Sequence, residues 1–186
     1  MNVYDFDHTL YKGDSTIDFW KYEISKHPKI LLDLPHQFLY AFKYLLGHVS
    51  KEKFKEEFYV FFQRIDDIDT EVNNFWDKQE GNFYPWYTAF ENINDLVISA
   101  SPEFIVREGC KRIGIKKVVA SKVDKNSGHY AGKNCRGEEK VRRYREVFDQ
   151  VPIDKFYSDS RSDDPLADIS REAFLVKNGK IVPWKK

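Results

Sequence analysis

The sequence has few cysteines, no long hydrophobic run and no excess of either charge. Two cysteines among 186 residues are too few for a disulfide framework and are typical of a reducing compartment. The longest apolar tract, residues 38–47, is about half as long as a membrane-spanning helix and contains Lys43. Thirty basic and thirty acidic residues balance, which argues against general binding to nucleic acid or anionic membranes. With no secretory signal visible at the N-terminus, we expect a cytoplasmic protein without a membrane span or a nucleic-acid partner.

What the sequence does contain is an alternation of short apolar runs with amphipathic segments. Each apolar run has the length and composition of a strand, and the last one contains an Asn-Gly turn, which is typical of a hairpin. The predicted strands cover residues 2–6, 95–101, 116–121, 154–160 and 172–182. The intervening segments have helical spacing. This order predicts an α/β fold with a mostly parallel sheet, helices on both faces and a three-layer, Rossmann-like core.

A block of helical sequence, residues 14–84, interrupts this alternation. We expect it to be an inserted helical cap, with residues 1–13 and 85–186 forming the α/β core. Ser15 is the expected N-cap of the first helix of the block. In residues 50–65, phenylalanines recur at helical spacing. They predict either the interior of the cap, or an apolar pocket or lipid-facing surface.

Three of the predicted strands end in polar residues that can do chemistry. Asp5 and Asp7 follow the first strand, Ser99 lies near the end of the second, and Asp159 lies near the end of a later one. In parallel sheets, ligands bind beyond the carboxyl ends of the strands, so these groups are expected to converge. Ionised carboxylates are costly to bury unless a positive charge accompanies them. Mg²⁺ is the natural partner, since it prefers oxygen ligands and commonly bridges to phosphate.

Lys140, about one turn into a predicted helix, completes a set of residues suited to phosphoryl transfer. A lysine in this place can contact a phosphoryl oxygen as a point charge. One carboxylate can attack phosphorus while the other moves a proton. The spacing leaves rivals open: Ser101 for Ser99, and Lys133 for Lys140. Ser101 is alternatively the cap of the helix that Pro102 opens.

Four short segments, in this order, resemble the motifs of the haloacid dehalogenase superfamily of phosphohydrolases, and within it the phosphoserine-phosphatase-like branch (subfamily IB). "DFDHTL" resembles the first motif, Asp-x-Asp-x-Thr, and "LVISAS" the second, an apolar strand that ends in Ser or Thr. Lys140 in "GKNCRGEEK" corresponds to the third, and "SDSRSDDPL" to the fourth, Asp-x-x-x-Asp. Each alone is weak evidence, but together they span nearly the whole chain.

The resemblance implies catalytic roles for four residues. Asp5 would be the nucleophile and a metal ligand. Asp7 would be the general acid and later the general base, and its backbone carbonyl would also contact Mg²⁺. Ser99 and Lys140 would hold the transferring phosphoryl group.

The resemblance also implies roles around these four residues. Asp159 would be a further metal ligand, and Asp163, which its spacing favours over Asp164, would orient the metal shell or the lysine. Thr9 is expected to brace the loop after the first strand. With His8 and Asp14, Thr9 is also assigned to the substrate-binding side.

The sequence departs from the family's pattern in three places. The residue after Asp7 is usually glycine and is His8 here, and the usual Gly-Asp-Gly of the fourth motif is Ser158-Asp159-Ser160. No counterpart is found of the cap arginine with which serine-specific members hold the substrate carboxylate. Asp14 stands where those members have a substrate-binding Glu, but a carboxylate is also favourable at the start of a helix. Free phosphoserine is therefore a doubtful substrate.

The function predicted from the sequence is Mg²⁺-dependent hydrolysis of a small phosphomonoester through an aspartyl-phosphate. The alternatives are transfer of the phosphoryl group to an alcohol, and a scaffold that binds metal or phosphate without turnover. The partner is a small-molecule phosphate ester, and a monomer is expected.

Overall fold

The protein is built around a six-stranded sheet in the order β3-β2-β1-β4-β5-β6. In the computed structural model, residues 1–87, 94–148 and 151–185 are described. Neighbouring strands are parallel except β5 and β6, which form an antiparallel hairpin. The strands are β1 (Asn2–Tyr4), β2 (Leu96–Pro102), β3 (Lys117–Ser121), β4 (Ile153–Ser158), β5 (Ser170–Lys177) and β6 (Lys180–Pro183). The predicted α/β class with a mostly parallel sheet is thereby confirmed.

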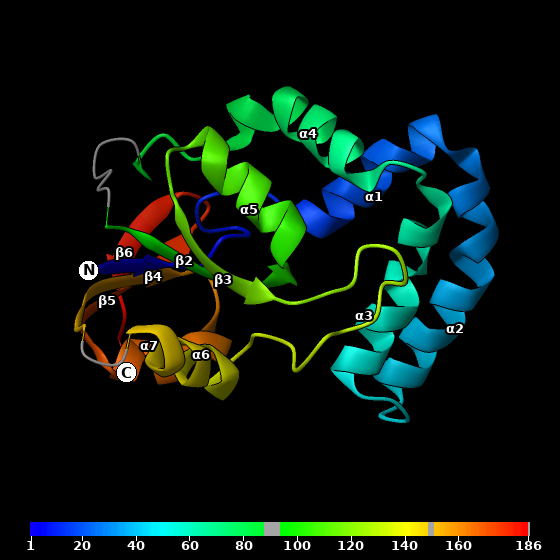
Figure 1. Cartoon of the computed structure of the whole chain (residues 1–186). Helices are drawn as coiled ribbons and strands as arrows, with labels where there is room; N and C mark the ends of the chain where they lie inside the picture. The colour runs from blue at the N-terminus through cyan, green and yellow to red at the C-terminus, as the bar shows by residue number, and fades with distance from the viewer. Residues whose placement is uncertain (88–93, 149–150, 186) are drawn as a thin grey trace.

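Helices cover both faces of this sheet. Helix α5 lies on one face and helices α6 and α7 lie on the other, so the core has three layers (Figure 1). The helices are α1 (Ser15–Lys26), α2 (Leu34–Leu45), α3 (Lys51–Tyr59), α4 (Ile68–Gln79), α5 (Glu103–Arg112), α6 (Glu138–Phe148) and α7 (Asp164–Asp168). None of the helices in the described ranges is long and apolar enough to cross a membrane.

Alternating side chains of the central strands build a separate core on each face. Val3 and Ile98 belong to the buried cluster that includes residues of α6 and α7, whereas Tyr4 and Val97 belong to the cluster that includes residues of α5. Successive side chains of a strand point to opposite faces, so a strand covered on both faces is apolar throughout. This explains why the strands read as continuous apolar runs.

Strand β1 occupies the place in the sheet where a ligand site is expected. It pairs with β2 on one side and with β4 on the other, and all three run in the same direction. The connections that leave β1 and its neighbours therefore diverge at their carboxyl ends and leave a crevice there. The chain segments that follow β1, β2 and β4 carry the predicted site residues.

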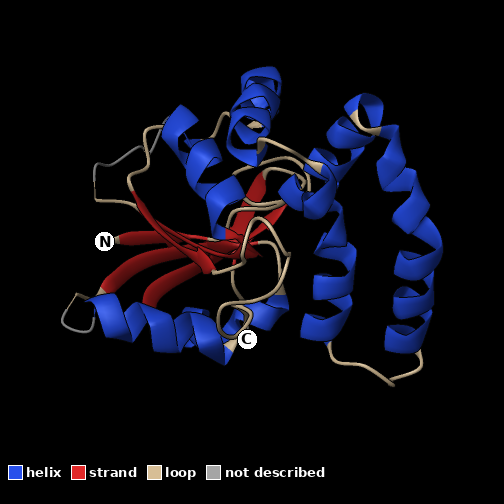
Figure 2. Ribbon diagram, turned by 45° about the vertical axis from the view of Figure 1, so that its right-hand side comes forward, coloured by secondary structure: helices blue, strands red, loops and turns tan. Residues whose placement is uncertain are grey.

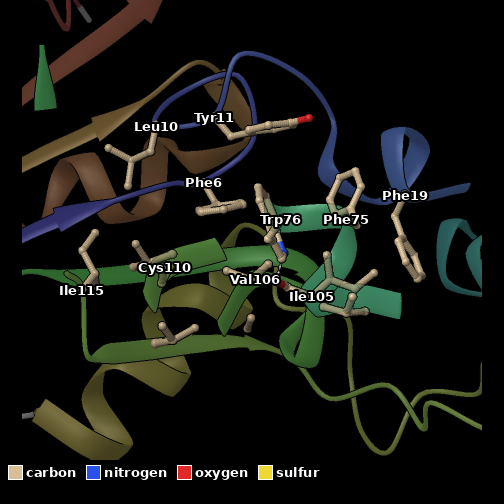
Figure 3. Close-up of a cluster of buried hydrophobic side chains, with 14 of the residues drawn as sticks. Phe6, Leu10, Tyr11, Phe19, Phe75, Trp76, Ile105, Val106, Cys110 and Ile115 are labelled. Atoms are coloured by element: carbon tan, nitrogen blue, oxygen red, sulfur yellow. Dashed lines mark hydrogen bonds between the residues drawn. The ribbon is translucent and has the colours of Figure 1, made fainter. Parts of the chain in front are cut away.

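The helical block between β1 and β2 shares its interior with the core. Helices α2 and α3 lie side by side, away from the sheet, whereas α4 lies beside α5 (Figures 1 and 2). Figure 3 shows Phe6 and Trp76 packed over the residues of α5. The Trp76 ring also donates a 2.9 Å hydrogen bond to the carbonyl of Ile105. This contact attaches the helical block to the core, while the exact boundary of the predicted cap at residues 14–84 stays a prediction.

The aromatic stripe of the block divides between two environments. Phe61 and Phe62 are buried in its interior, whereas Phe54 and Phe58 line a pocket that faces the sheet. A separate apolar face is exposed to solvent along α2 and the 3₁₀-helix before it. Its exposed side chains are Leu31, Leu32, Phe38, Leu39, Phe42, Leu45 and Leu46. The interior and pocket predictions for the stripe are thus each correct for part of it.

Two local predictions are wrong in detail. The cap of α1 is Asp14 and not Ser15, because Asp14 Oδ1 accepts hydrogen bonds from the backbone N–H groups of Thr16 and Ile17. The helix predicted for residues 50–65 is α-helical only to Tyr59 and then continues as the 3₁₀-helix Val60–Arg64.

Candidate active site

One pocket lies beyond the carboxyl ends of β1, β2 and β4. Its volume is about 360 Å³. It brings together residues that lie up to 158 positions apart in the sequence. The predicted site residues that line it are Asp5, Asp7, His8, Asp14, Ser99, Lys140, Asp159 and Asp163. Of the predicted set, Thr9 is the residue that does not line the pocket.

Lys140 lies at the centre of the charged groups in this pocket. Its Nζ donates to Asp5 Oδ1 at 2.8 Å and to Asp163 Oδ2 at 2.7 Å, and its side chain is only 2% exposed. Ser158 Oγ donates to the same Asp163 oxygen at 2.8 Å. The rival Lys133 is exposed and lies outside the pocket. Of the two lysines that the sequence left open, only Lys140 lies in this pocket, and its role stays a prediction.

The pKa values of Asp5 and Lys140 are shifted by burial and by the neighbouring charges. Burial raises the pKa of Asp5 to about 7; the ammonium of Lys140 opposes this shift, and the nearby Asp163 adds to it. Burial alone would lower the pKa of Lys140, but the carboxylates of Asp5 and Asp163 raise it above its usual range. Lys140 is thus a permanent cation beside Asp5.

Each carboxylate oxygen of Asp7 accepts one hydrogen bond. Its Oδ1 accepts from the backbone N–H of Ser15 at 2.7 Å, and its Oδ2 accepts from Ser101 Oγ at 2.5 Å. Ser101 therefore does not cap the following helix: α5 begins after Pro102 and has no side-chain cap. Ser99 Oγ instead accepts from the backbone N–H of Ser101 at 3.1 Å. Ser101 lies two positions beyond Ser99, and strand periodicity is the signal that could have assigned it to the site.

The environment of Asp7 suits a group that exchanges a proton near neutral pH. Burial raises its pKa to about 7, and the charge of Asp14 adds to this effect. The hydrogen bonds from Ser101 and Ser15 stabilise the ionised form and act in the opposite direction. A general acid or base works best when its pKa lies near the working pH.

Thr9 fixes the loop that carries the fourth motif. It is fully buried, and its hydroxyl accepts a 3.0 Å hydrogen bond from the backbone N–H of Asp159. The expected bracing role fits this contact, but contact with a substrate does not, because Thr9 is absent from the pocket wall. His8 does line the pocket and has a backbone φ of 55°, a left-handed conformation that favours glycine. That conformation explains the glycine usual at this position in the resembling family.

The carboxylates at the core end of the pocket suit a divalent cation. Burial is the largest cause that raises the pKa of Asp5 and of Asp159, the charge of Asp163 adds to both shifts, and the ammonium of Lys140 opposes both. Asp163 Oδ1 is buried and has no hydrogen-bond partner among the described residues. Within the same ranges, no three His, Cys, Asp or Glu side chains are already arranged around one point. Mg²⁺ needs only one or two carboxylates together with water and substrate oxygens, so the residues present fit this ion.

The opposite wall of the pocket comes mainly from the helical block. Ile17 of α1 and Phe54, Phe58 and Tyr59 of α3 make it apolar. Three further cations line the pocket, Lys51 and Lys55 of α3 and Arg136 in the loop before α6. None of the three was predicted from the sequence. The spacing of four between Lys51 and Lys55, which places both on one helix face, could have indicated them. Asp14 lies in the same wall, where its carboxylate also caps α1.

The family of the chain follows from a comparison with known proteins. The model of the family described as haloacid dehalogenase-like hydrolase matches residues 3–168, which include every predicted site residue. The chain belongs to the haloacid dehalogenase-like hydrolases. The family inferred from the four motifs is thereby confirmed. No curated protein sequence matches the chain.

Solved structures share the fold of this haloacid dehalogenase-like hydrolase at low sequence identity. A protein of unknown function from Bordetella pertussis Tohama I is 16% identical, with a TM-score of 0.67 over 93% of this chain and 87% of that one. A phosphoserine phosphohydrolase-like protein from Francisella tularensis is 13% identical, with a TM-score of 0.57 over 93% and 86%. A phospho-aspartyl intermediate analogue of phosphoserine phosphatase is 13% identical, with a TM-score of 0.54 over 92% and 83%. At these identities, the comparison establishes the shared fold.

Proposed function

We propose that this haloacid dehalogenase-like hydrolase is a Mg²⁺-dependent phosphatase that hydrolyses a small phosphomonoester through an aspartyl-phosphate on Asp5. The observation that carries the proposal is the contact of Lys140 with both Asp5 and Asp163 in the pocket that also contains Asp7. Two structures with the same fold, a phosphoserine phosphatase and a phospho-aspartyl intermediate analogue of one, support the same reaction class.

In the first half of the reaction, Asp5 attacks the phosphorus atom and the ester bond to the leaving group breaks. Lys140, held beside Asp5 by Asp163, contacts the phosphoryl oxygens and stabilises the negative charge that develops on them. Ser99, at the end of β2, donates its hydroxyl to the same group. Asp7 protonates the leaving alcohol, which requires a carboxyl that retains its proton near pH 7.

In the second half, water attacks the phosphorus atom of the aspartyl-phosphate and releases inorganic phosphate. Asp7, now ionised, accepts the proton of that water. The hydrogen bonds from Ser15 and Ser101 hold its carboxylate in the orientation that both halves need. The apolar wall of α1 and α3 restricts the access of bulk water to the pocket.

Asp5 and Asp159, with the backbone carbonyl of Asp7, would hold the magnesium ion, and Asp163 would orient this shell through Lys140. The ion would neutralise charge on the phosphoryl group and on the clustered carboxylates. Because it would bind the folded protein only, Mg²⁺ should also raise the melting temperature.

The test is hydrolysis of p-nitrophenyl phosphate with and without Mg²⁺. We expect turnover with Mg²⁺, its loss with a chelator, and a fall of about a thousandfold or more in Asp5→Asn, because this variant lacks the nucleophile. Asp164→Asn is the matched control: Asp164 is exposed and bonds to Arg161 and Trp184 outside the pocket. It should retain wild-type turnover.

Different outcomes separate the alternative functions. Mass spectrometry of acid-quenched protein should show phosphate on Asp5 during turnover. Faster loss of that phosphate when an alcohol is added, with the phosphate appearing on the alcohol, would favour a phosphotransferase. Binding of Mg²⁺ and phosphate without turnover of any ester would favour a scaffold. A melting temperature unchanged by saturating Mg²⁺ would contradict the metal site.

A further inference from the structure

Three positive charges face the pocket without taking part in the proposed phosphoryl chemistry. Lys51 and Lys55 project from α3, and Arg136 lies in the loop before α6. No ion pair within 4.0 Å joins any of the three to a carboxylate in the described parts of the chain. By contrast, Lys53 on the same helix pairs with Glu57, and Lys140 pairs with Asp5 and Asp163. These three cations are therefore left free to pair with a ligand.

Lys55 is the most enclosed of the three. Its Nζ donates a 2.8 Å hydrogen bond to the carbonyl of Ala100, the residue between Ser99 and Ser101. An ammonium has three donors, and this contact uses one of them. Burial, opposed by Asp14 and reinforced by Lys51, lowers the pKa of Lys55 to about 8. An anion bound here would relieve the cost of burying this charge.

Lys51 and Arg136 lie close enough to Lys55 for their charges to add. Burial is the main cause that lowers the pKa of Lys51, and the positive charge of Arg136 is the next. Like charges held together from two separate chain segments are unfavourable unless an anion lies between them. Asp14 offsets part of this charge, but its Oδ1 is already shared between two backbone N–H groups of α1.

The position of these cations relative to the proposed chemistry indicates what they bind. Asp5, Ser99 and Lys140 occupy the core end of the pocket, whereas Lys51, Lys55 and the aromatic side chains of Phe54 and Phe58 form the wall from the cap. A phosphomonoester bound with its phosphorus atom at Asp5 therefore directs its leaving group towards that wall. This step rests on the proposed function.

We propose that Lys51, Lys55 and Arg136 bind a second anionic group on the leaving-group side of the substrate. The substrate class is then a phosphomonoester that carries a further phosphate or a carboxylate. Asp14 and Glu52 act on Lys51, and Asp14 and Asp7 act on Lys55, but no carboxylate among the described residues forms an ion pair with any of the three cations. A further phosphate, which carries more negative charge than a carboxylate, is therefore favoured.

The experiment compares kcat/KM for three phosphate esters of similar size: glycerol phosphate, phosphoglycerate and glycerol bisphosphate. Only the last two carry a second anionic group, a carboxylate in one and a phosphate in the other. We expect the wild-type protein to prefer glycerol bisphosphate over glycerol phosphate by at least about tenfold, with phosphoglycerate between them or equal to the bisphosphate. The order of the two doubly anionic esters identifies the second group.

Variants test whether the preference resides in these side chains. Lys51→Ala and Arg136→Ala should each reduce the ratio of kcat/KM between glycerol bisphosphate and glycerol phosphate by about three- to tenfold. Lys55→Met tests the buried cation, and a thermal melt shows whether the loss of its bond to Ala100 also affects folding. Lys53→Ala, which removes a positive charge from α3 outside the pocket, should keep the wild-type ratio.

The results that overturn the inference differ from those that overturn the proposed function. Equal kcat/KM for all three esters, or variants that lower all three equally, would contradict the anion subsite while leaving the phosphatase intact. If no ester is hydrolysed, the proposed function fails, and calorimetric titration of the wild-type protein with the same three esters tests the subsite directly. A tighter Kd for glycerol bisphosphate that is lost in Lys51→Ala and Arg136→Ala would still support it, and equal Kd values would refute it.

Discussion

The two walls of the pocket differ in whether their charged side chains have bonding partners within the protein. On the core wall, Asp5, Asp163 and Lys140 are buried but bonded to one another, and Asp7 accepts two hydrogen bonds. On the side of the helical block, Lys51 has no carboxylate within 4.0 Å among the described residues. In the same part of the chain, the buried Glu23 accepts no hydrogen bond and has only His27 Nε2 at 3.4 Å as an ion-pair neighbour. The core is thus preorganised before any ligand binds, as transition-state stabilisation requires. The helical block leaves the charge of Lys51 without an ion pair, which costs stability but keeps this charge available to bind a ligand.

The variant with the largest expected effect removes Lys140, the cation that bonds to both Asp5 and Asp163 on the core wall. Lys140→Met leaves the carboxylates of Asp5 and Asp163 buried without their shared partner, so we expect a loss of about 3–5 kcal/mol in the free energy of unfolding. Turnover of p-nitrophenyl phosphate should fall by about a thousandfold or more, because the phosphoryl contact is lost as well. Urea denaturation and steady-state kinetics measure the two effects.

Lys133→Met is the control for that variant. Lys133 is exposed and lies outside the pocket, so both the stability and the turnover should stay near wild type. Equal stability and equal turnover in the two variants would show that the contacts of Lys140 with Asp5 and Asp163 have no functional role.

A smaller change tests the hydrogen bond that orients Asp7. The Ser101 hydroxyl stabilises the ionised form of Asp7 and so lowers its pKa, whereas burial raises it to about 7. Ser101→Ala should therefore raise that pKa further. The alkaline limb of the kcat/KM profile, where Asp7 loses its proton, should move up by up to about one pH unit, with a rate loss of about tenfold at its optimum.

Ser99→Ala separates this effect from a general loss of hydroxyl groups. Ser99 contacts the backbone of Ser101 and not Asp7, so its removal should lower the rate without moving the alkaline limb. An unchanged pH profile in Ser101→Ala would show that its bond to Asp7 does not tune the general acid.

The smallest expected effect concerns Glu23, a buried acid of the helical block. Burial, with the charge of Glu71 next, raises the pKa of Glu23 to about 7, well above its value in the unfolded chain. The neutral form is the one the fold favours, so the contribution of Glu23 to stability is fully present below about pH 4 and is lost as the pH rises through about 7. Glu23→Gln should abolish this decline and add about 1–3 kcal/mol at pH 8.

Thermal melts between pH 4 and pH 8 measure the Glu23 effect, with Glu172→Gln as an exposed control. His27 Nε2 lies 3.4 Å from Glu23 Oε2, so the Glu23→Gln variant also changes this contact. A Glu23→Gln variant with the same pH dependence as wild type would show that the charge of Glu23 is compensated after all.

Much of the fold could be predicted from the sequence because its signals are local. Apolar runs with helices between them predicted the parallel sheet, and the Asn-Gly pair predicted the β5–β6 hairpin, in which Asn178 and Gly179 both adopt positive φ. Errors arose where one residue had two possible roles. Asp14 rather than Ser15 caps α1, since Asp14 Oδ1 accepts from the backbone N–H groups of Thr16 and Ile17.

By itself, the sequence determined the family, the order of its motifs and the candidate residues at the ends of the strands. Only the tertiary structure decided between Lys140 and Lys133, joined Ser101 to Asp7, removed Thr9 from the pocket wall and brought Lys51, Lys55 and Arg136 to one place. The physical reason is that strand and helix periodicities are set by neighbouring residues. Burial and charge pairing, in contrast, depend on contacts such as that of Lys140 with Asp5, 135 residues apart, which exist only once the chain has folded.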